Sequence, residues 1–411
     1  MNSYRWVVLA VATFTQAASG FFVQGIGALG VQLQFDLGLS AAQLGLLMSA
    51  AQLAPLLGLL VAGALLDRFD ERWVVGAGAA VVGAALLAGA WAPGYAALLA
   101  VLFVVGAGYS TVQPGGSKSV ASWFDASRRG TAMGIRQAGL PFGAALASAV
   151  LPPLAVAHGW RAACAFGGVI ALLGAAAFLL FHRRPPAPLT AAPQNRGVVR
   201  SPALIRATLC GISLVSVHCG IGLLTVLHLH EVAGMTAGAA ASVLVGVQIA
   251  GMTGRIVLAA CSDRTRSRQS VVTVSMLAIV AGLALLVTPA GRIPVTASLV
   301  FVWLGFFGIG WIGPWIAQVT EAAPPGRTGF VLGLVMAVNQ AAIVIVPPVL
   351  GALRDVTGGF AAPWALLIAM TAAALAGLLP GRGVPPSGSD RRRGAAAGAG
   401  RTHSPARTPT G

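Results

Sequence analysis

Residues 63–72 read GALLDRFDER, and residues 259–268, which begin 196 positions later, read AACSDRTRSR. Each stretch follows a long apolar run and contains an aspartate with an arginine directly after it and a further arginine at its end. A pair of adjacent prolines also recurs, as Pro152-Pro153 and Pro347-Pro348, at an offset of 195. Two separate landmarks at nearly one offset indicate that the chain contains one unit duplicated in tandem.

The composition indicates that both copies lie in a membrane. Of the 411 residues, 57% are hydrophobic and 9% are charged, whereas soluble proteins carry about 25% charged residues. Crossing a bilayer takes ~20 apolar residues as a helix, because backbone polar groups must pair internally in lipid. We therefore predict an all-α membrane protein with twelve transmembrane helices in two pseudo-symmetric six-helix bundles. The predicted spans are 6–31, 41–66, 73–91, 95–118, 131–156, 162–182, 204–230, 237–260, 270–288, 294–319, 328–350 and 362–380.

Two segments without apolar periodicity divide the chain. Residues 183–203 are rich in proline and arginine, and we predict a cytoplasmic linker that joins an N-terminal bundle, residues 1–182, to a C-terminal bundle, residues 204–380. Residues 381–411 consist mainly of glycine, alanine, proline and arginine. A segment of this composition buries too little apolar surface to fold, so we expect a disordered basic cytoplasmic tail.

The net charge of +16 follows from the positions of the arginines. With the predicted spans, 20 basic residues fall on one side of the membrane and 3 on the other. Cytoplasmic loops carry the excess of Lys and Arg, so we predict a multi-pass protein of a bacterial inner membrane with both termini in the cytoplasm. The charge therefore indicates the lipid bilayer as a partner and gives no reason to expect a nucleic acid.

The sequence carries no signature of catalysis. It contains neither a phosphate-binding loop nor a constellation of nucleophile and base. The four cysteines have no paired spacing and lie in or beside apolar runs, so neither a metal site nor a disulfide framework is indicated. We expect no enzyme activity and no cofactor.

Two arginines stand inside predicted spans, where ionisable side chains are costly and usually functional. Arg136 and Arg255 both lie ~10–12 Å from the cytoplasmic end of their spans at 1.5 Å per residue. No acidic residue falls in the middle of any predicted span. Two such arginines would repel each other, and an anionic ligand held by bidentate contacts would relieve the repulsion. Snorkelling to the cytoplasmic interface is the alternative for each of them.

Other polar and aromatic side chains form stripes at the three- and four-residue spacing of one helix face. Gln113 follows Tyr109 by four residues, for example, and Trp315 follows Trp311 by four. We predict that these faces enclose a central cavity. The alternative is hydrogen bonding between helices, worth about 1 kcal/mol or less, or simple helix packing for the tryptophans. The predicted substrate-binding residues are Arg255, Arg136, Gln24, Gln113, Tyr109, His218, Gln248, Trp311, Trp315 and Asn339.

The segment Gly63-x-x-x-Asp67-Arg68 with Arg72 resembles the signature of the loop between spans 2 and 3 in the major facilitator superfamily. Its copy departs from that pattern, because Ala259 stands where glycine is usual. The resemblance covers roughly residues 5–380. It implies two halves that rock about a substrate site near the middle of the membrane.

The same segments have a mechanical interpretation. A carboxylate at the cytoplasmic end of span 2 can bind arginines or the N-terminus of a neighbouring helix and so hold that end closed. Anchoring by the positive-inside rule alone is the alternative. The predicted gating residues are Gly63, Asp67, Arg68, Arg72, Asp263, Arg264 and Arg268.

Two further segments resemble branches of the superfamily that handle small anions. Residues 134–143, GIRQAGLPFG, resemble nitrate-, cyanate- and carboxylate-type permeases, and Gly254-Arg255 resembles the span-8 arginine of the oxalate and monocarboxylate branches. The resemblance thus implies a secondary active transporter of a small anionic solute, a carboxylate or inorganic anion, that works as a monomer by alternating access. A coupling proton or a counter-anion is a further expected partner.

Two other functions stay open at this point. The first is efflux of a drug or metabolite, although proton-coupled exporters usually need a buried carboxylate, which His218 would have to replace. The second is a transporter-like membrane receptor, although the short tail shows no signalling domain.

Overall fold

The computed structural model describes residues 4–124, 126–183, 201–265, 267–323 and 328–378. Most of the predicted linker, 183–203, and all of the predicted tail, 381–411, lie outside these residues. The regular structure of the described part is helical. Its elements are α1 (Tyr4–Gly25), α2 (Gly30–Leu37), α3 (Ala41–Arg68), α4 (Glu71–Gly89), α5 (Tyr95–Trp123), α6 (Ala126–Phe181), α7 (Pro202–Glu231), α8 (Ala237–Thr265), α9 (Arg268–Val287), η1 (Pro289–Arg292), α10 (Pro294–Gly310), α11 (Ile312–Ala322), α12 (Thr328–Thr357) and α13 (Ala361–Leu378).

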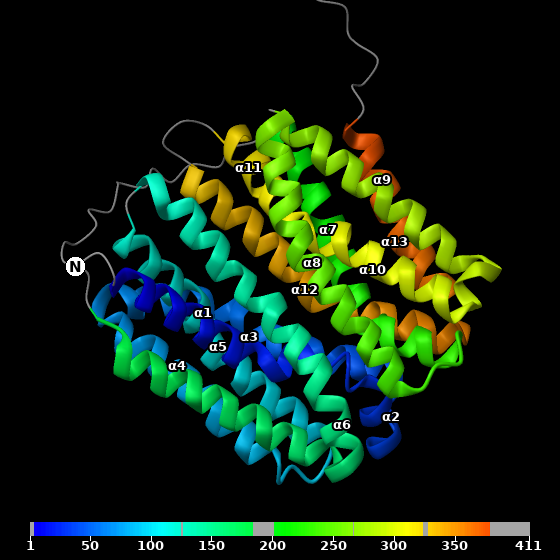
Figure 1. The fold of residues 1–411 in the computed structure, drawn as a ribbon, viewed down its shortest axis with the longest axis horizontal. Helices are drawn as coiled ribbons and strands as arrows, with labels where there is room; N and C mark the ends of the chain where they lie inside the picture. Colours follow the sequence, from blue (N-terminus) through cyan, green and yellow to red (C-terminus); the bar gives the residue numbers. More distant parts are fainter. Residues whose placement is uncertain (1–3, 125, 184–200, 266, 324–327, 379–411) are drawn as a thin grey trace, which may run out of the picture.

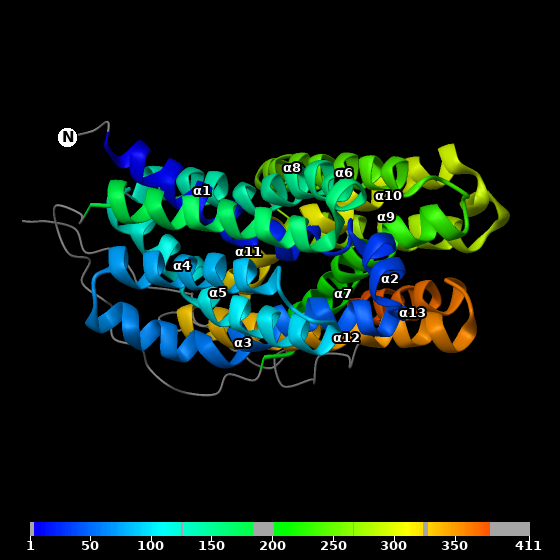
Figure 2. The same ribbon diagram turned by 90° about the horizontal axis from the view of Figure 1, so that it is seen from below.

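Two sets of helices lie side by side, one formed by α1–α6 and the other by α7–α13 (Figure 1). We call them the N-half and the C-half. The most extensive packing across the boundary between them is of α6 beside α8 and of α3 beside α12. Figure 2 shows these two pairs in different layers, α6 with α8 in one and α3 with α12 in the other.

The described residues contain ten helices long and apolar enough to cross a membrane, or eleven if α2 and the first part of α3, bent by 113°, form one span. The 56-residue α6 is counted once among these, yet its backbone leaves the helical region at Gly159, which has φ +80°. A positive φ is a conformation that glycine adopts at little cost. Dividing α6 at Gly159 gives two spans, which correspond to the predicted spans 131–156 and 162–182. The number of candidate spans then rises from eleven to the predicted twelve.

The first predicted span, 6–31, is not one continuous helix. The helix α1 ends at Gly25, and after a turn α2 begins at Gly30. Between them, Gly27 packs against the carbonyl group of Gly222 in the C-half so closely that a Cβ atom at position 27 would collide with its oxygen. The break follows from this backbone approach, which the apolar run alone does not indicate.

The predicted span 294–319 is also interrupted. It consists of α10, which ends at Gly310, and α11, which begins at Ile312. Pro314 lacks an N–H group, so the Gly310 carbonyl has no donor four residues ahead, and proline at such a place kinks or breaks a helix. The break falls at Trp311, whose own backbone stays in the helical region, and α10 and α11 together form one candidate span, Pro294–Ala322.

The two halves meet tightly where α3 begins and α12 ends, and we call this region the closed end. Glycines permit the approach, because a Cβ atom at Gly45 would collide with the backbone of Pro347, and one at Gly351 would collide with that of Ala41. Small residues allow such close packing between membrane helices. Ser49 of α3 adds a hydrogen bond of 2.6 Å to the Val344 carbonyl of α12.

A carboxylate from the C-half completes the N-terminus of α3. Asp355 accepts hydrogen bonds from the N–H groups of Ala41 at 3.0 Å and Ala42 at 2.8 Å. Ser40 forms a capping box with Gln43, so the side chains of Ser40 and Asp355 satisfy the N–H groups of residues 41 to 43. Arg354 contacts Asp355 and also pairs with Glu231 at the end of α7. The closed end therefore combines backbone packing with a charge at a helix N-terminus.

We predict that Asp355→Asn loosens the closed end. A carboxylate at a partly buried helix N-terminus stabilises the contact by about 1–2 kcal/mol. Its loss should therefore raise the population of molecules whose halves are apart at the closed end roughly tenfold. Spin labels at Phe35 and Val356, which are 85% and 86% exposed, would report the change as a longer inter-label distance, with the exposed Cys261 replaced by serine.

The matched control is Asp36→Asn, because Asp36 bonds Gln32 within its own helix at 2.7 Å. This variant should leave the distance distribution as in the wild type. Identical distributions for Asp355→Asn and Asp36→Asn would contradict a latch at Asp355.

Candidate functional site

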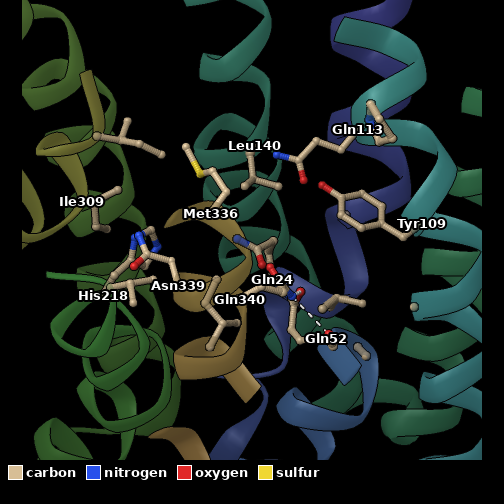
Figure 3. Close-up of a pocket in the computed structure, with 18 of the residues that line it drawn as sticks. Gln24, Gln52, Tyr109, Gln113, Leu140, His218, Ile309, Met336, Asn339 and Gln340 are labelled. Atoms are coloured by element: carbon tan, nitrogen blue, oxygen red, sulfur yellow. Dashed lines mark hydrogen bonds between the residues drawn. The ribbon is translucent and has the colours of Figure 1, made fainter. Parts of the chain in front are cut away.

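A cavity of about 390 Å³ lies between the two halves, and both contribute to its walls. Figure 3 shows Tyr109 and Gln113 of α5 on one side and His218 of α7 with Asn339 of α12 on the other. Gln24 and Gln340 lie between these two walls. A cavity at the boundary of two repeated halves is the usual place for a solute in transporters with internal repeats.

Arg255 of α8 is the charged residue in the wall of this cavity. Among the described lining residues it is the one with a permanent charge, and none of them is acidic. Its Nε donates to the Ile309 carbonyl at 3.3 Å, and its Nη1 donates to the Gln137 carbonyl at 3.0 Å. A guanidinium group has five N–H donors, so these bonds leave donors for an anionic group in the cavity.

Three further polar atoms, each buried in a side chain that lines the cavity, have no hydrogen-bond partner among the described residues. They are the Tyr109 hydroxyl, Trp311 Nε1 and Asn339 Oδ1. Buried polar groups are nearly always paired in folded proteins, and exceptions need an explanation. Hydroxyl, indole N–H and amide oxygen together offer both donors and an acceptor, which suits a ligand that carries hydroxyl groups.

Arg136 lies behind the wall and does not line the cavity. Its Nη2 donates to the Gln113 carbonyl at 2.7 Å and to the Val112 carbonyl at 3.4 Å, and the side chain is fully buried. Gly116 of α5 makes room for it, because a Cβ atom there would lie 2.9 Å from Nη2. The sequence places Arg136 and Arg255 at a similar depth in their predicted spans. In the structure only Arg255 reaches the cavity.

Eight of the ten predicted binding residues are brought together at this cavity. Gln248 is the other exception, since it is buried in α8 away from the lining residues. Trp315 lines the cavity but uses its indole N–H on the Ala207 carbonyl, at 2.7 Å, so it presents an aromatic surface. The eight are Arg255, Gln24, Gln113, Tyr109, His218, Trp311, Trp315 and Asn339.

The structure adds Gln52 to this set, which the sequence analysis missed. Gln52 of α3 lines the cavity, and its side-chain and backbone oxygens accept from Gln340 Nε2 at 3.2 and 3.1 Å. The two glutamines belong to different halves, so this contact closes the cavity on the side of the closed end. The polar amide of Gln52 in the middle of the predicted span 41–66 could have indicated this residue as a candidate for the cavity.

Three of the predicted gating residues, Arg72, Asp263 and Arg268, form contacts within their own halves. Arg268 bonds Asp263 and Glu321, which ties together α8, α9 and α11 of the C-half. Arg72 donates to the Leu179 carbonyl inside the N-half.

Arg68, Arg264 and Gly63 form no hydrogen bond or ion pair across the boundary among the described residues. Arg68 and Arg264 are exposed, and the side chain of Asp67 lies outside the described residues. Gly63 has open space where a Cβ atom would lie. A gating role for this set therefore stays a prediction.

Similarity to known proteins agrees with this architecture. The chain is 28% identical over 400 residues to an uncharacterized MFS-type transporter of Mycobacterium tuberculosis, covering 95% of this chain and 88% of that protein. It is 25% identical to a probable galactarate/D-glucarate transporter of Bacillus subtilis, covering 87% and 88%. With the hexuronate transporter of Escherichia coli it shares 27% identity over 194 residues, which cover 45% of this chain and 43% of the transporter.

The fold matches solved structures over nearly the whole chain. A bacterial homolog of the human lysosomal transporter Spinster, in an inward-facing and occupied conformation, superposes with a TM-score of 0.77 and 15% identity. The alignment covers 91% of this chain and 96% of that one. The pattern of the Major Facilitator Superfamily matches residues 9–347, well over half of the sequence. The chain therefore belongs to the Major Facilitator Superfamily, as a multi-pass membrane protein that is a secondary transporter and not an enzyme.

Proposed function

We propose that this transporter carries a small hydroxylated carboxylate, whose negative charge binds Arg255, by alternating access of its two halves. The proposal rests on the position of Arg255. Among the described residues that line the cavity, Arg255 is the one with a permanent charge, and none is a carboxylate. An unpaired charge in a membrane interior is costly. A carboxylate that accepts two parallel N–H bonds from the guanidinium would remove that cost with defined geometry.

The uncharged groups of the cavity support a hydroxylated ligand. Asn339 Oδ1 needs a donor, Trp311 Nε1 needs an acceptor, and the Tyr109 hydroxyl can serve as either. A hydroxyl group both donates and accepts, so a polyol chain attached to the carboxylate would satisfy all three. An alkyl carboxylate of the same size would leave them unpaired, which is strongly disfavoured.

The named relatives support the same class. Hexuronate, galactarate and D-glucarate, after which two of them are named, are all hydroxylated carboxylates. Hexuronates have one carboxylate and aldarates have two. The single arginine at this cavity favours a solute with one carboxylate.

The distribution of basic residues supports an orientation for this transport. Twenty basic residues on the side of the termini against three on the other favour cytoplasmic termini in a bacterial cytoplasmic membrane. The start of α3 and the end of α12 then face away from the cytoplasm. In this orientation the closed end blocks the outer side, and the cavity is reached from the cytoplasm.

We predict that Arg255→Gln weakens binding of D-glucuronate about 10- to 100-fold, because a hydrogen bond to a charged group contributes roughly 1.5–3 kcal/mol. Arg255→Lys keeps the charge but loses the planar fork, and its affinity should lie between the two. Isothermal titration of the purified protein measures all three, with uncharged D-glucose as the control ligand.

Two results would contradict the anion site. One is wild-type affinity for D-glucuronate in Arg255→Gln. The other is a rise in melting temperature with apolar cations while D-glucuronate, D-gluconate and D-glucarate leave it unchanged, which would favour the exporter.

Arg136→Met tests the division between the two arginines. Among the described residues Arg136 donates hydrogen bonds only to backbone carbonyls of α5, and it does not line the cavity, so D-glucuronate affinity should stay within about threefold of wild type. Burying a charged guanidinium costs desolvation free energy that methionine does not incur, so the melting temperature should not fall. A loss of affinity as large as that of Arg255→Gln would instead place Arg136 at the ligand.

A further inference from the structure

A proline inside α6 leaves one backbone acceptor without its usual donor. In an α-helix each carbonyl accepts from the N–H group four residues ahead. Pro141 has no N–H group, so the carbonyl of Gln137 has no donor at that position. An unpaired carbonyl in a membrane interior costs free energy unless another group donates to it.

Arg255 of the other half donates to this carbonyl. Its Nη1 lies 3.0 Å from the Gln137 oxygen, across the boundary between α8 and α6. Its Nε is bound to the Ile309 carbonyl, which belongs to the same half as Arg255. The guanidinium is thus held by one carbonyl from each half, and the cross-boundary acceptor is one that lacks its usual helical donor because residue 141 is proline.

The same arrangement occurs at the second crossing of the boundary. Pro348 of α12 leaves the carbonyl of Val344 without a donor four residues ahead, and Ser49 of α3 donates to it at 2.6 Å. A third side-chain donor that crosses the boundary, Gln340, uses the Gln52 carbonyl, which is not four residues before a proline. The bonds from Arg255 and Ser49 therefore both end on a carbonyl freed by proline.

We propose that Pro141 is a positioning residue of the binding site, because the carbonyl that it frees at Gln137 orients the guanidinium of Arg255 from the opposite half. The consequence for transport rests on the proposed anion site. With Nη1 and Nε directed to fixed carbonyls, the remaining donors of Arg255 face the cavity in a defined geometry. The anion site is then complete only while α6 and α8 touch at this level, which couples affinity to the relative position of the halves.

The decisive experiment needs no transported solute. Pro141→Ala supplies the missing N–H group, which pairs with the Gln137 carbonyl and competes with Arg255. Phenylglyoxal attacks the terminal nitrogens of arginine, so the modification of Arg255, followed by mass spectrometry of its peptide, reports how firmly they are held. We expect modification about 3- to 10-fold faster in Pro141→Ala, the factor for one hydrogen bond of ordinary strength.

Pro55→Ala is the matched control. Pro55 lies inside α3 and frees the Ala51 carbonyl, which packs against Gly106 within the N-half. This variant should leave the rate at Arg255 unchanged. An equal rate at Arg255 in wild type and Pro141→Ala would overturn the inference, as would equal acceleration in Pro55→Ala. If Pro141→Ala does not fold, Pro141→Ser supplies the same N–H group and replaces it.

Titration with D-glucuronate separates this inference from the proposed function. If both hold, Pro141→Ala weakens D-glucuronate binding about 3- to 10-fold and adds nothing further in an Arg255→Lys background, because the effect passes through the guanidinium. An altered rate at Arg255 without D-glucuronate binding in the wild type would refute the proposed class and leave the positioning role intact. D-glucuronate binding in the wild type, with an equal modification rate at Arg255 in wild type and Pro141→Ala, would refute the positioning role and leave the proposed class intact.

Discussion

Backbone hydrogen bonding in an apolar surrounding is the constraint on which this structure depends. Within a bilayer each N–H and C=O group needs a partner from the protein, so the described regular structure is helical and every break in a helix must be compensated. Several of these compensations come from the opposite half. The N–H groups that open α3 reach Asp355, and the carbonyl four residues before Pro348 receives Ser49. The halves bind each other partly because side chains of each half form hydrogen bonds with unpaired backbone groups of the other.

The charged groups near the boundary have different surroundings and therefore different roles. Asp355 faces a helix N-terminus and joins the two halves at the closed end. Arg136 is enclosed by α5, so its charge is met by backbone carbonyls within one half. Arg255 alone combines a cross-boundary contact with a place at the cavity. A solute bound there would contact a side chain that already depends on both halves.

The sequence predicts the fold of this protein better than it predicts the site. Apolar runs and repeated landmarks are local, so the twelve spans and the duplication can be found along the chain. The direction of a side chain depends on its neighbours, and Arg136 turns away from the cavity because Gly116 makes room for it. The partner of Asp355 lies 314 residues away at Ala41, so no local pattern indicates that contact. The interruption near Gly27 coincides with a backbone contact to the other half, which no local pattern indicates, whereas Pro314 is a local signal for the one at Trp311.

The contact between Gly27 and the Gly222 carbonyl has a mechanical consequence. Both residues lack a side chain, and a Cβ atom at Gly27 would collide with the Gly222 carbonyl. Backbone that packs directly on backbone, here and at Gly45 and Gly351, leaves no side chain to repack when two bodies change their relative tilt. Any residue larger than glycine at position 27 would push the halves apart at this contact.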